Sequence, residues 1–355
     1  MRKSIILTSL MITVALCSIT AVVGATALPE IKILATGGTI AGAAVKTSVP
    51  GEYKAGAINI QKLLAAVPQI KNIATVSGEQ VVSIGSNNMT DAILLQLARR
   101  CNELLAQDKV SGIVITHGTD TLEETAYFLN LTVQSNKPVV LVGSMRPATL
   151  ISADGPMNLL NAVRLAADTQ SRGKGVLIAM NDSINDARET TKTSTYKVET
   201  FKAPELGALG YFVYGKVYFY REPLRRHTAK SEFAVSNLTI LPRVDIIYTH
   251  VSDDRALIDA AVQAGAQGIV YAGSGMGSIH EHAEPGLVDA QKQGVVIVRS
   301  SRVGNGLVVA DSEKYAANKF LNGDNLNPQK AGILLQLALT RTKDLAQIQR
   351  IFNEY

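Results

Sequence analysis

Tryptophan is absent from this chain, and aromatic residues make up only 5% of it. Long blocks of one charge are missing too: lysine and arginine never occur in runs longer than two, and the most basic cluster is residues 225–227. A net charge of +5 spread in this way over 355 residues is not the concentrated basic surface that binds nucleic acid. The composition therefore argues against a nucleic-acid partner, whereas the length is ample for a buried core and for two domains.

Cysteine is scarce as well, because only Cys17 and Cys101 occur. Cys17 lies in an N-terminal segment that we expect to be removed, which leaves Cys101 alone. A single thiol cannot form an intrachain disulfide, so an oxidising compartment would add no crosslink to the monomer. Cys101 falls within an apolar periodic stretch, and we expect it to be a small buried hydrophobic residue.

The one long apolar run stands at the N-terminus. Two basic residues precede apolar residues 5–23, and the small residues Ala25 and Ala27 follow. This order predicts a signal peptide of residues 1–27 that is cut after Ala27, and export to the periplasm. The alternative is a membrane anchor, because the run could nearly span a bilayer. The cleavage site, with no stop-transfer pattern after it, favours removal, so we expect no anchor on the mature chain.

Strand-like and helix-like segments alternate along the rest of the chain. Apolar runs predict strands at residues 31–35, 112–116, 138–143, 175–180, 244–249, 268–272 and 295–299. A helical period of apolar residues predicts helices that start at Thr90, near residue 121 and near residue 152, and two last helices at 328–339 and 343–352.

This alternation predicts an α/β fold with a mostly parallel sheet covered by helices on both faces. Residues 221–242 are polar and basic, contain prolines, and predict a linker. We therefore expect a large N-terminal catalytic α/β domain at residues 28–220 and a smaller C-terminal α/β domain at residues 243–355. Ligands of parallel sheets bind beyond the C-terminal strand ends.

A first polar segment stands at such a strand end. It is TGGTIA at residues 36–41, in which two glycines precede Thr39. Glycines let backbone N–H groups approach a ligand and point at developing negative charge. A simple strand-to-loop turn has the same composition, so the segment alone does not decide between the two.

The second polar segment is HGTDTL at residues 117–122, which places Thr119 and Asp120 where a helix begins. The free N–H groups at the start of a helix bind anions, so this position is suited to a ligand site. Threonine and aspartate are also ordinary N-caps, which is the structural alternative. His117 is expected to be a structural hydrogen bonder, because no serine or cysteine nucleophile motif accompanies it.

Together and in this order, TGGTIA and HGTDTL resemble the two signatures of the bacterial L-asparaginase/glutaminase family, type II. The resemblance covers residues 28–355, and its further segments are GEQV at 78–81, GSMRP at 143–147, ADGP at 153–156, ND at 181–182, RSSR at 299–302 and LNPQK at 326–330. It implies a periplasmic amidohydrolase that converts L-asparagine to L-aspartate and ammonia, without a cofactor or a metal. Comparable activity on L-glutamine stays open as an alternative.

The resemblance also implies roles for individual residues. Thr39 matches the family's nucleophile, which attacks the side-chain amide and forms an acyl-enzyme. Tyr53 matches the tyrosine of a mobile loop that contacts the nucleophile and helps to move its proton. Thr119, Asp120 and Lys192 match a second catalytic cluster, in which a lysine held against a threonine handles the proton. By itself, Lys192 in the segment TKT looks like a surface lysine.

Substrate contacts are implied in the same way. Asp120, beside Thr119, matches the residue that binds the α-ammonium group, and Ser86 the one that binds the α-carboxylate. Asn87 departs from the family's usual glutamine or glutamate, and its shorter reach leaves the substrate preference open. Ser278 and Glu313 match residues that complete the site of a neighbouring subunit, within a homotetramer built from two intimate dimers.

Three rival functions have weaker support. The glycine pattern at 273–278 hints at a dinucleotide-binding oxidoreductase, but Ser278 stands where the fingerprint needs glycine or alanine, and Asp289 is too close for its acidic residue. His280 and His282 lack a third ligand for a metal. A non-catalytic binding protein for polar amino acids would share export and two α/β domains, but it has no use for a hydroxyl nucleophile and its base.

Overall fold

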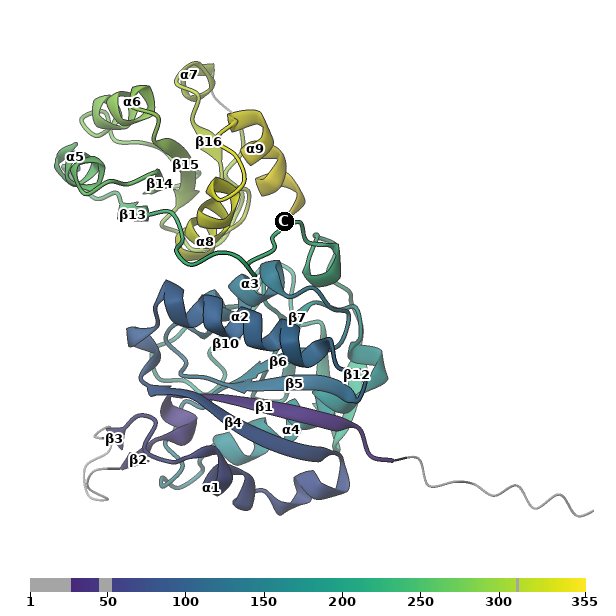
Figure 1. Cartoon of the computed structure of the whole chain (residues 1–355). Coiled ribbons are helices and arrows are strands. Elements are labelled where there is room, and N and C mark those ends of the chain that lie inside the picture. Colours follow the sequence, from purple (N-terminus) through teal and green to yellow (C-terminus); the bar gives the residue numbers. More distant parts are fainter. Residues whose placement is uncertain (1–26, 45–52, 311–312) are drawn as a thin grey trace, which may run out of the picture.

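The computed structural model describes residues 27–44, 53–310 and 313–355 (Figure 1). The predicted signal peptide, apart from Ala27, therefore lies outside the described residues. The two largest sheets, each with helices on both faces, lie one above the other, and the predicted α/β fold class is confirmed. In the described part of the chain, no helix combines the length and the apolar character needed to cross a bilayer.

The large sheet has eight strands in the order β12-β11-β8-β7-β6-β5-β1-β4. Their bounds are β1 Glu30–Gly37, β4 Thr75–Ile84, β5 Val110–Thr116, β6 Val139–Val142, β7 Val176–Met180, β8 Ser183–Asp186, β11 Gly210–Val213 and β12 Lys216–Phe219. Five neighbouring strands, β4, β1, β5, β6 and β7, run parallel to one another. Beyond them, β8, β11 and β12 each pair antiparallel with the strand before them in the sheet. β4 was not predicted because it is an edge strand without a single fully buried residue, and so lacks an apolar run.

Helices cover the two faces of this sheet. α2 (Asp91–Leu105) and α3 (Leu122–Thr132) pack on one face, and α1 (Ile60–Ala65) and α4 (Gly155–Ala167) on the other (Figure 1). Along β5, Ile113 and Ile115 belong to the first core and Val114 to the second, as strand alternation requires. Cys101 lies fully buried in α2, as predicted, and burial raises the pKa of its thiol to about 12.

Two helix starts differ in how well the sequence predicted them. Thr90 caps α2 as expected, since its hydroxyl accepts a hydrogen bond of 3.4 Å from the Ile93 N–H. α4 begins at Gly155, later than predicted. Ser152 has a left-handed φ of 59°, and the Asp154 carboxylate accepts N–H bonds from the preceding GSMRP segment instead of capping the helix.

The small sheet is fully parallel, in the order β13-β14-β15-β16. Its strands are β13 Val244–Tyr248, β14 Gly268–Gly273, β15 Val296–Ser301 and β16 Leu321–Asn322. α5 (Ala256–Gln263) and α6 (Glu284–Lys292) pack on one face, and α8 (Pro328–Leu339) and α9 (Leu345–Glu354) on the other. The short helix α7 is Glu313–Ala317. The three strands and two last helices expected here are confirmed.

The segment predicted as a linker is packed rather than loose. Residues 221–242 hold one 3-10 turn, Thr228–Lys230, and otherwise irregular backbone. Phe233 in this segment is 2% exposed, and its ring centre lies 5.1 Å from that of the C-terminal Tyr355. Through Phe233 the segment therefore contributes to the buried core that lies between the two sheets, while other parts of it stay exposed.

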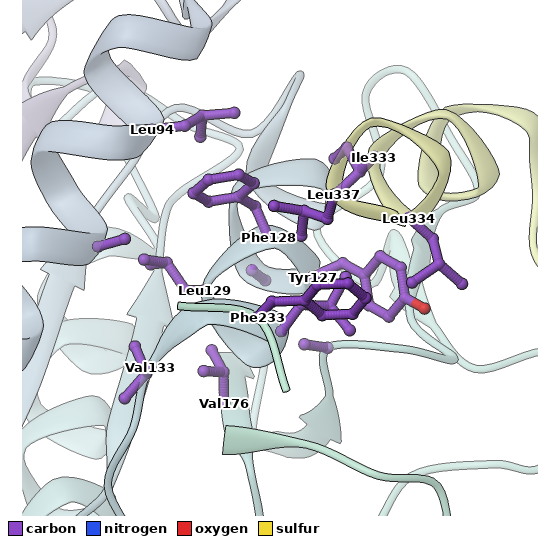
Figure 2. Packing of buried hydrophobic residues seen from close by; sticks show 14 of the residues in the cluster. Leu94, Tyr127, Phe128, Leu129, Val133, Val176, Phe233, Ile333, Leu334 and Leu337 are labelled. Carbon is purple, nitrogen blue, oxygen red and sulfur yellow. The ribbon is translucent and has the colours of Figure 1, made fainter. Parts of the chain in front are cut away.

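Helices α3 and α8 join the two halves of the molecule (Figure 2). Apolar side chains of α2, α3 and α8 form one continuous core. It includes Leu94 of α2, Tyr127 and Phe128 of α3, and Ile333, Leu334 and Leu337 of α8. Helix α3 begins at the end of the HGTDTL segment, and α8 begins within the LNPQK segment. The packing of these two helices therefore fixes the positions of both segments.

Phe128→Ala is expected to lower the free energy of unfolding by about 3–5 kcal/mol, because it leaves a cavity in this shared core. Phe128 is fully buried. Leu224→Ala is the matched control, since Leu224 is 98% exposed and its loss should change stability by less than about 0.5 kcal/mol. Denaturant unfolding measures both values, and equal effects of the two substitutions would contradict the packing described here.

Candidate active site

Three neighbouring parallel strands end at the same edge of the large sheet, and each is followed by a predicted site residue. β1 lies between β4 and β5, and the pair of Ala35 with Thr116 brings the ends of β1 and β5 level. Thr39, Ser86 and Thr119 therefore follow the C-terminal ends of three adjacent strands. This is the edge at which open parallel sheets bind ligands, as the sequence predicted.

The two signature segments touch through bare backbone. A Cβ on Gly38 would lie 2.3 Å from the Gly118 Cα, and Gly38 has a left-handed φ of 77°. A Cβ on Gly118 would lie 2.6 Å from the Ser86 hydroxyl oxygen. Only glycine fits at either position, so the glycines of TGGTIA do more than form a turn.

Thr39 starts the 3-10 turn Thr39–Ala41 and is 7% exposed. Its carbonyl accepts a hydrogen bond of 2.8 Å from the Gly42 N–H, which closes the turn. The chain returns to this turn after the following loop, because the Gly56 N–H donates to the Gly38 carbonyl at 3.1 Å. The turn is thus held from both sides.

The backbone of Tyr53 lies beside the segment that carries Thr39. β2 (Ala43–Ala44) pairs antiparallel with β3 (Tyr53–Lys54), and Ala44 stands opposite Tyr53. Residues 45–52, which hold most of the predicted mobile loop, lie outside the described residues, and the side-chain role of Tyr53 stays a prediction.

Ser86 is bound to the HGTDTL segment on two sides. Its hydroxyl accepts a hydrogen bond of 3.1 Å from the Asp120 N–H, and its carbonyl accepts one of 2.8 Å from the Thr121 hydroxyl. Ser86 is 4% exposed. The N-cap of α3 is Thr121, so the alternative that Thr119 or Asp120 caps this helix is wrong.

Lys192 brings a distant part of the chain to this cluster. It lies on β9 (Thr191–Lys192), which pairs with β10 (Phe201–Lys202). Its ammonium nitrogen is 2.9 Å from the Thr119 hydroxyl oxygen and 2.7 Å from the Asp120 carboxylate. The lysine side chain is 18% exposed and that of Asp120 is 61% exposed, so the carboxylate faces solvent. The surface-lysine interpretation of Lys192 is therefore wrong.

A cavity of about 370 Å³ opens beside this pair. Asp120, Lys192 and residues 193–195 line it. All of these residues belong to the half of the chain that builds the large sheet. The volume falls within the range of about 300–1,000 Å³ that is typical of small-molecule sites, so it is large enough for a small amino acid.

His117 is fully buried behind the cluster. Its Nδ1 lies 2.7 Å from the Gly118 carbonyl oxygen and its Nε2 lies 2.9 Å from the Thr125 hydroxyl oxygen. Burial lowers the pKa of His117 to about 4, against the smaller opposite effect of the Gly118 bond, so the ring is neutral near pH 7. These contacts agree with the predicted structural role.

Of the predicted site residues, only Asp120 and Lys192 line this cavity. Asn87 is exposed and its amide lies 3.4 Å from the Asn88 side-chain oxygen. Ser278 and Glu313 are exposed residues of the half of the chain that builds the small sheet. None of these three lines the cavity beside Lys192.

A buried arginine, which the sequence did not single out, links the segments of Ser278 and Glu313. The Arg299 guanidinium donates to the carbonyls of Met276 and Gly277 at 3.1 Å each, and it lies 4.0 Å from the ring centre of Tyr315 in α7. Arg299 belongs to the segment RSSR, which supports the family resemblance but by itself predicts no role. The signal that could have singled it out is a charged residue at the end of an apolar strand, which calls for buried partners.

The His280–His282 pair shows no metal-like arrangement with a third ligand. The two ring centres are 5.4 Å apart, and within the described residues no three histidine, cysteine, aspartate or glutamate side chains lie where they could share a metal ion. The residues precede α6, at an exposed turn.

Comparison with known proteins bears directly on this geometry. The family "Asparaginase, N-terminal" matches residues 30–225, and the family "Glutaminase/Asparaginase C-terminal domain" matches residues 243–352. The chain belongs to the asparaginase family. The resemblance found in the sequence is thereby confirmed, and both signature segments lie within the N-terminal match.

Individual relatives are similar over almost the whole chain. L-asparaginase 2 of Bacillus subtilis is 57% identical over 328 residues, which cover 92% of this chain and 87% of the relative. "Probable L-asparaginase periplasmic" of Haemophilus influenzae is 51% identical and the match covers 96% and 98% of the two chains. "Glutaminase-asparaginase" of Pseudomonas fluorescens biotype A is 47% identical, with 93% and 91% covered.

A solved structure has the same fold. It is that of a probable cytoplasmic L-asparaginase from Campylobacter jejuni, with a TM-score of 0.90 and 49% identity. The match covers 92% of this chain and all of that one.

The stability of the protein should fall between pH 6.5 and pH 4 in part because of His117. In this range the unfolded chain protonates the histidine and the folded chain does not, since its pKa is lowered to about 4. Unfolding therefore becomes easier as the pH falls, by up to about 1.4 kcal/mol per pH unit. His117→Gln cannot take up this proton, so its free energy of unfolding should vary less steeply with pH. Parallel pH dependences of the two proteins would show that His117 is solvated.

Proposed function

We propose that this protein is an amidohydrolase that converts L-asparagine to L-aspartate and ammonia, with Thr39 as the nucleophile. The observation that carries the proposal is the contact of the Lys192 ammonium group with Thr119 and Asp120. This contact lies at the edge of the large sheet where the strand before Thr39 also ends. Family membership and the names of the relatives support the same reaction.

In the proposed first step the Thr39 hydroxyl oxygen attacks the side-chain amide carbon of asparagine. The hydroxyl loses its proton, the amide nitrogen gains one, and the carbon–nitrogen bond breaks to release ammonia and leave an ester on Thr39. Water then attacks the ester, which releases aspartate and restores the hydroxyl. A threonine hydroxyl is a weak nucleophile at neutral pH, so a proton acceptor is required.

Two groups are proposed to move that proton. Lys192 would act through the Thr119 hydroxyl, to which its nitrogen lies at hydrogen-bond distance. Tyr53 would contact Thr39 from the loop side, which the pairing of β2 with β3 supports at the level of the backbone. General acid–base steps of this kind contribute about 10²–10⁴-fold to a rate.

Substrate recognition is proposed to use the groups around this cluster. Asp120 offers an exposed carboxylate for the α-ammonium group. Ser86 and Asn87 would bind the α-carboxylate end. The Asp120 N–H holds the Ser86 hydroxyl at the C-terminal edge of the large sheet. Opposite charges and hydrogen bonds at both ends of the amino acid would place the amide at Thr39.

Glutamine is the second candidate substrate, because three relatives bear the name glutaminase-asparaginase. Glutamine is longer than asparagine by one methylene, and a pocket distinguishes such pairs by only about 1–3 kcal/mol. The ratio of the two maximal rates on the purified protein decides between an asparaginase and an enzyme for both amides.

We further propose export to the periplasm and assembly into a homotetramer built from two intimate dimers. Residues 1–27 have the pattern of a signal peptide, and the Haemophilus relative bears the word periplasmic in its name, whereas the Campylobacter structure bears the word cytoplasmic. The exposure of Ser278 and Glu313 supports a role in the site of a partner subunit.

Thr39→Ala is expected to reduce ammonia release from asparagine by more than about a thousandfold and to leave the fold intact, because it removes the attacking hydroxyl and only one methyl group besides. Thr39→Ser is the matched control, since it keeps a hydroxyl, and it should retain far more activity. Ammonia release with saturating asparagine and circular dichroism measure both properties. If Thr39→Ala keeps more than about a thousandth of the wild-type rate, Thr39 is not the nucleophile.

Subunit exchange tests the shared site. Thr39→Ala and Glu313→Ala subunits, each nearly inactive alone, are dissociated and reassembled as a mixture. In a mixed two-fold pair, one site inherits both defects and the other combines an intact Thr39 with an intact Glu313 from the second chain. Activity should therefore reappear.

No recovery in the mixture would mean that Glu313 serves the site of its own chain. A Glu313→Ala protein with nearly wild-type activity would remove Glu313 from the site altogether.

A further inference from the structure

A buried carboxylate holds the backbone of Lys192. Glu123 is 4% exposed, and its Oε2 accepts a hydrogen bond of 2.7 Å from the Lys192 N–H. Its Oε1 accepts bonds from two side chains at the start of α8, at 2.6 Å from the Gln329 amide and at 3.2 Å from the Asn327 amide. All three partners are donors, so both oxygens of this group are required as acceptors.

The same turn of α8 also holds the residues just before Lys192. Lys330 is 1% exposed, and its ammonium group donates to the carbonyl of Arg188 at 2.7 Å and to the carbonyl of Thr190. The backbone before Lys192 is thus bound through its carbonyls, and Lys192 itself through its N–H. Both anchors come from buried groups, whose loss is costly because their partners stay unsatisfied.

These anchors matter because β9, the strand that carries Lys192, is very short. It is two residues long and pairs only with the equally short β10, with Phe201 opposite Lys192. Such a short ribbon does not fix a side chain by itself. The Lys192 nitrogen nevertheless lies within 3 Å of both Thr119 and Asp120.

We propose that Glu123 is a positioning residue for the reaction: together with the first turn of α8 it sets the place of Lys192 against Thr119. The inference rests on the proposed function, in which Lys192 moves a proton through Thr119. It also means that helix α8, from the half of the chain that builds the small sheet, supports the active site of its own chain. This support is separate from the proposed contribution of Ser278 and Glu313 to the site of a partner.

A favourable interaction with the dipole of α3 would be the ordinary explanation for an acidic residue here, since Glu123 and Glu124 both stand in its first turn. That explanation applies equally to the two residues. Only Glu123 bonds to the Lys192 backbone. Glu124→Gln is therefore a matched control for Glu123→Gln.

Glu123→Gln keeps the shape but turns one acceptor into a donor. Whichever way the new amide is oriented, its NH₂ group faces either the Lys192 N–H or the two amides of α8. We expect kcat on asparagine to fall about 10–100-fold, part of the contribution that acid–base groups make, with KM changed less than about twofold. Glu124→Gln should keep kcat within about twofold of wild type.

A double-mutant cycle with Lys192→Met shows whether Glu123 acts through Lys192. In the Lys192→Met protein the proton-moving group is already gone, so Glu123→Gln should reduce kcat by less than about twofold there. A general loosening of the structure would reduce kcat by the same factor in both backgrounds. Glu123→Gln/Gln329→Glu should recover several-fold of the lost rate, because the new amide can then donate to a carboxylate.

Should Glu123→Gln fail to fold, Gln329→Leu replaces it in the same cycle. It removes one donor to the Glu123 carboxylate, and a loss of about three- to tenfold in kcat is expected with Lys192 present and none in Lys192→Met. Equal losses in both backgrounds, or no loss in either, overturn the inference. If Lys192→Met itself keeps the wild-type kcat, the proposed role of Lys192 fails together with this inference; if only Lys192→Met is impaired, the inference alone fails.

Discussion

The close approach of two backbones, at Gly38 after β1 and at Gly118 after β5, is the constraint on which the rest of the site depends. With 2.3 Å between a Cβ built on Gly38 and the Gly118 Cα, neither segment can carry a side chain there. The contact places the Thr39 turn, the Ser86 turn and the start of α3 at one point of the sheet edge. Parallel pairing of adjacent strands makes this possible, because their C-terminal ends meet at the same edge.

The half of the chain that builds the small sheet is joined to this edge in two different ways. Helix α8 packs on α3 through an apolar core, and its first turn adds polar contacts to Glu123 and to the turn before Lys192. The loop of Ser278 and helix α7 are instead tied to each other by Arg299, and they face solvent. One half of the molecule thus offers a buried support within the chain and an exposed surface that another chain could use.

Most of the fold could be predicted from sequence because its strands are apolar runs and its helices have a clear period. β4 escaped because an edge strand buries few side chains, and α4 was placed too early because Asp154 bonds to a neighbouring loop instead of capping. Among site residues, Thr39 and Thr119 follow strand ends that local sequence reveals, whereas Ser86 follows β4, which local sequence does not reveal. Lys192 and Glu123 are brought together across 69 positions of sequence, and no local pattern encodes such a contact.

The burial of Cys101 in α2 has a practical consequence. It is the only cysteine in the described part of the chain, it is fully buried, and burial raises the pKa of its thiol to about 12, so thiolate is scarce at neutral pH. A thiol-reactive dye can therefore modify it only when α2 leaves the sheet. The rate of this labelling measures how often α2 separates from the sheet under working conditions.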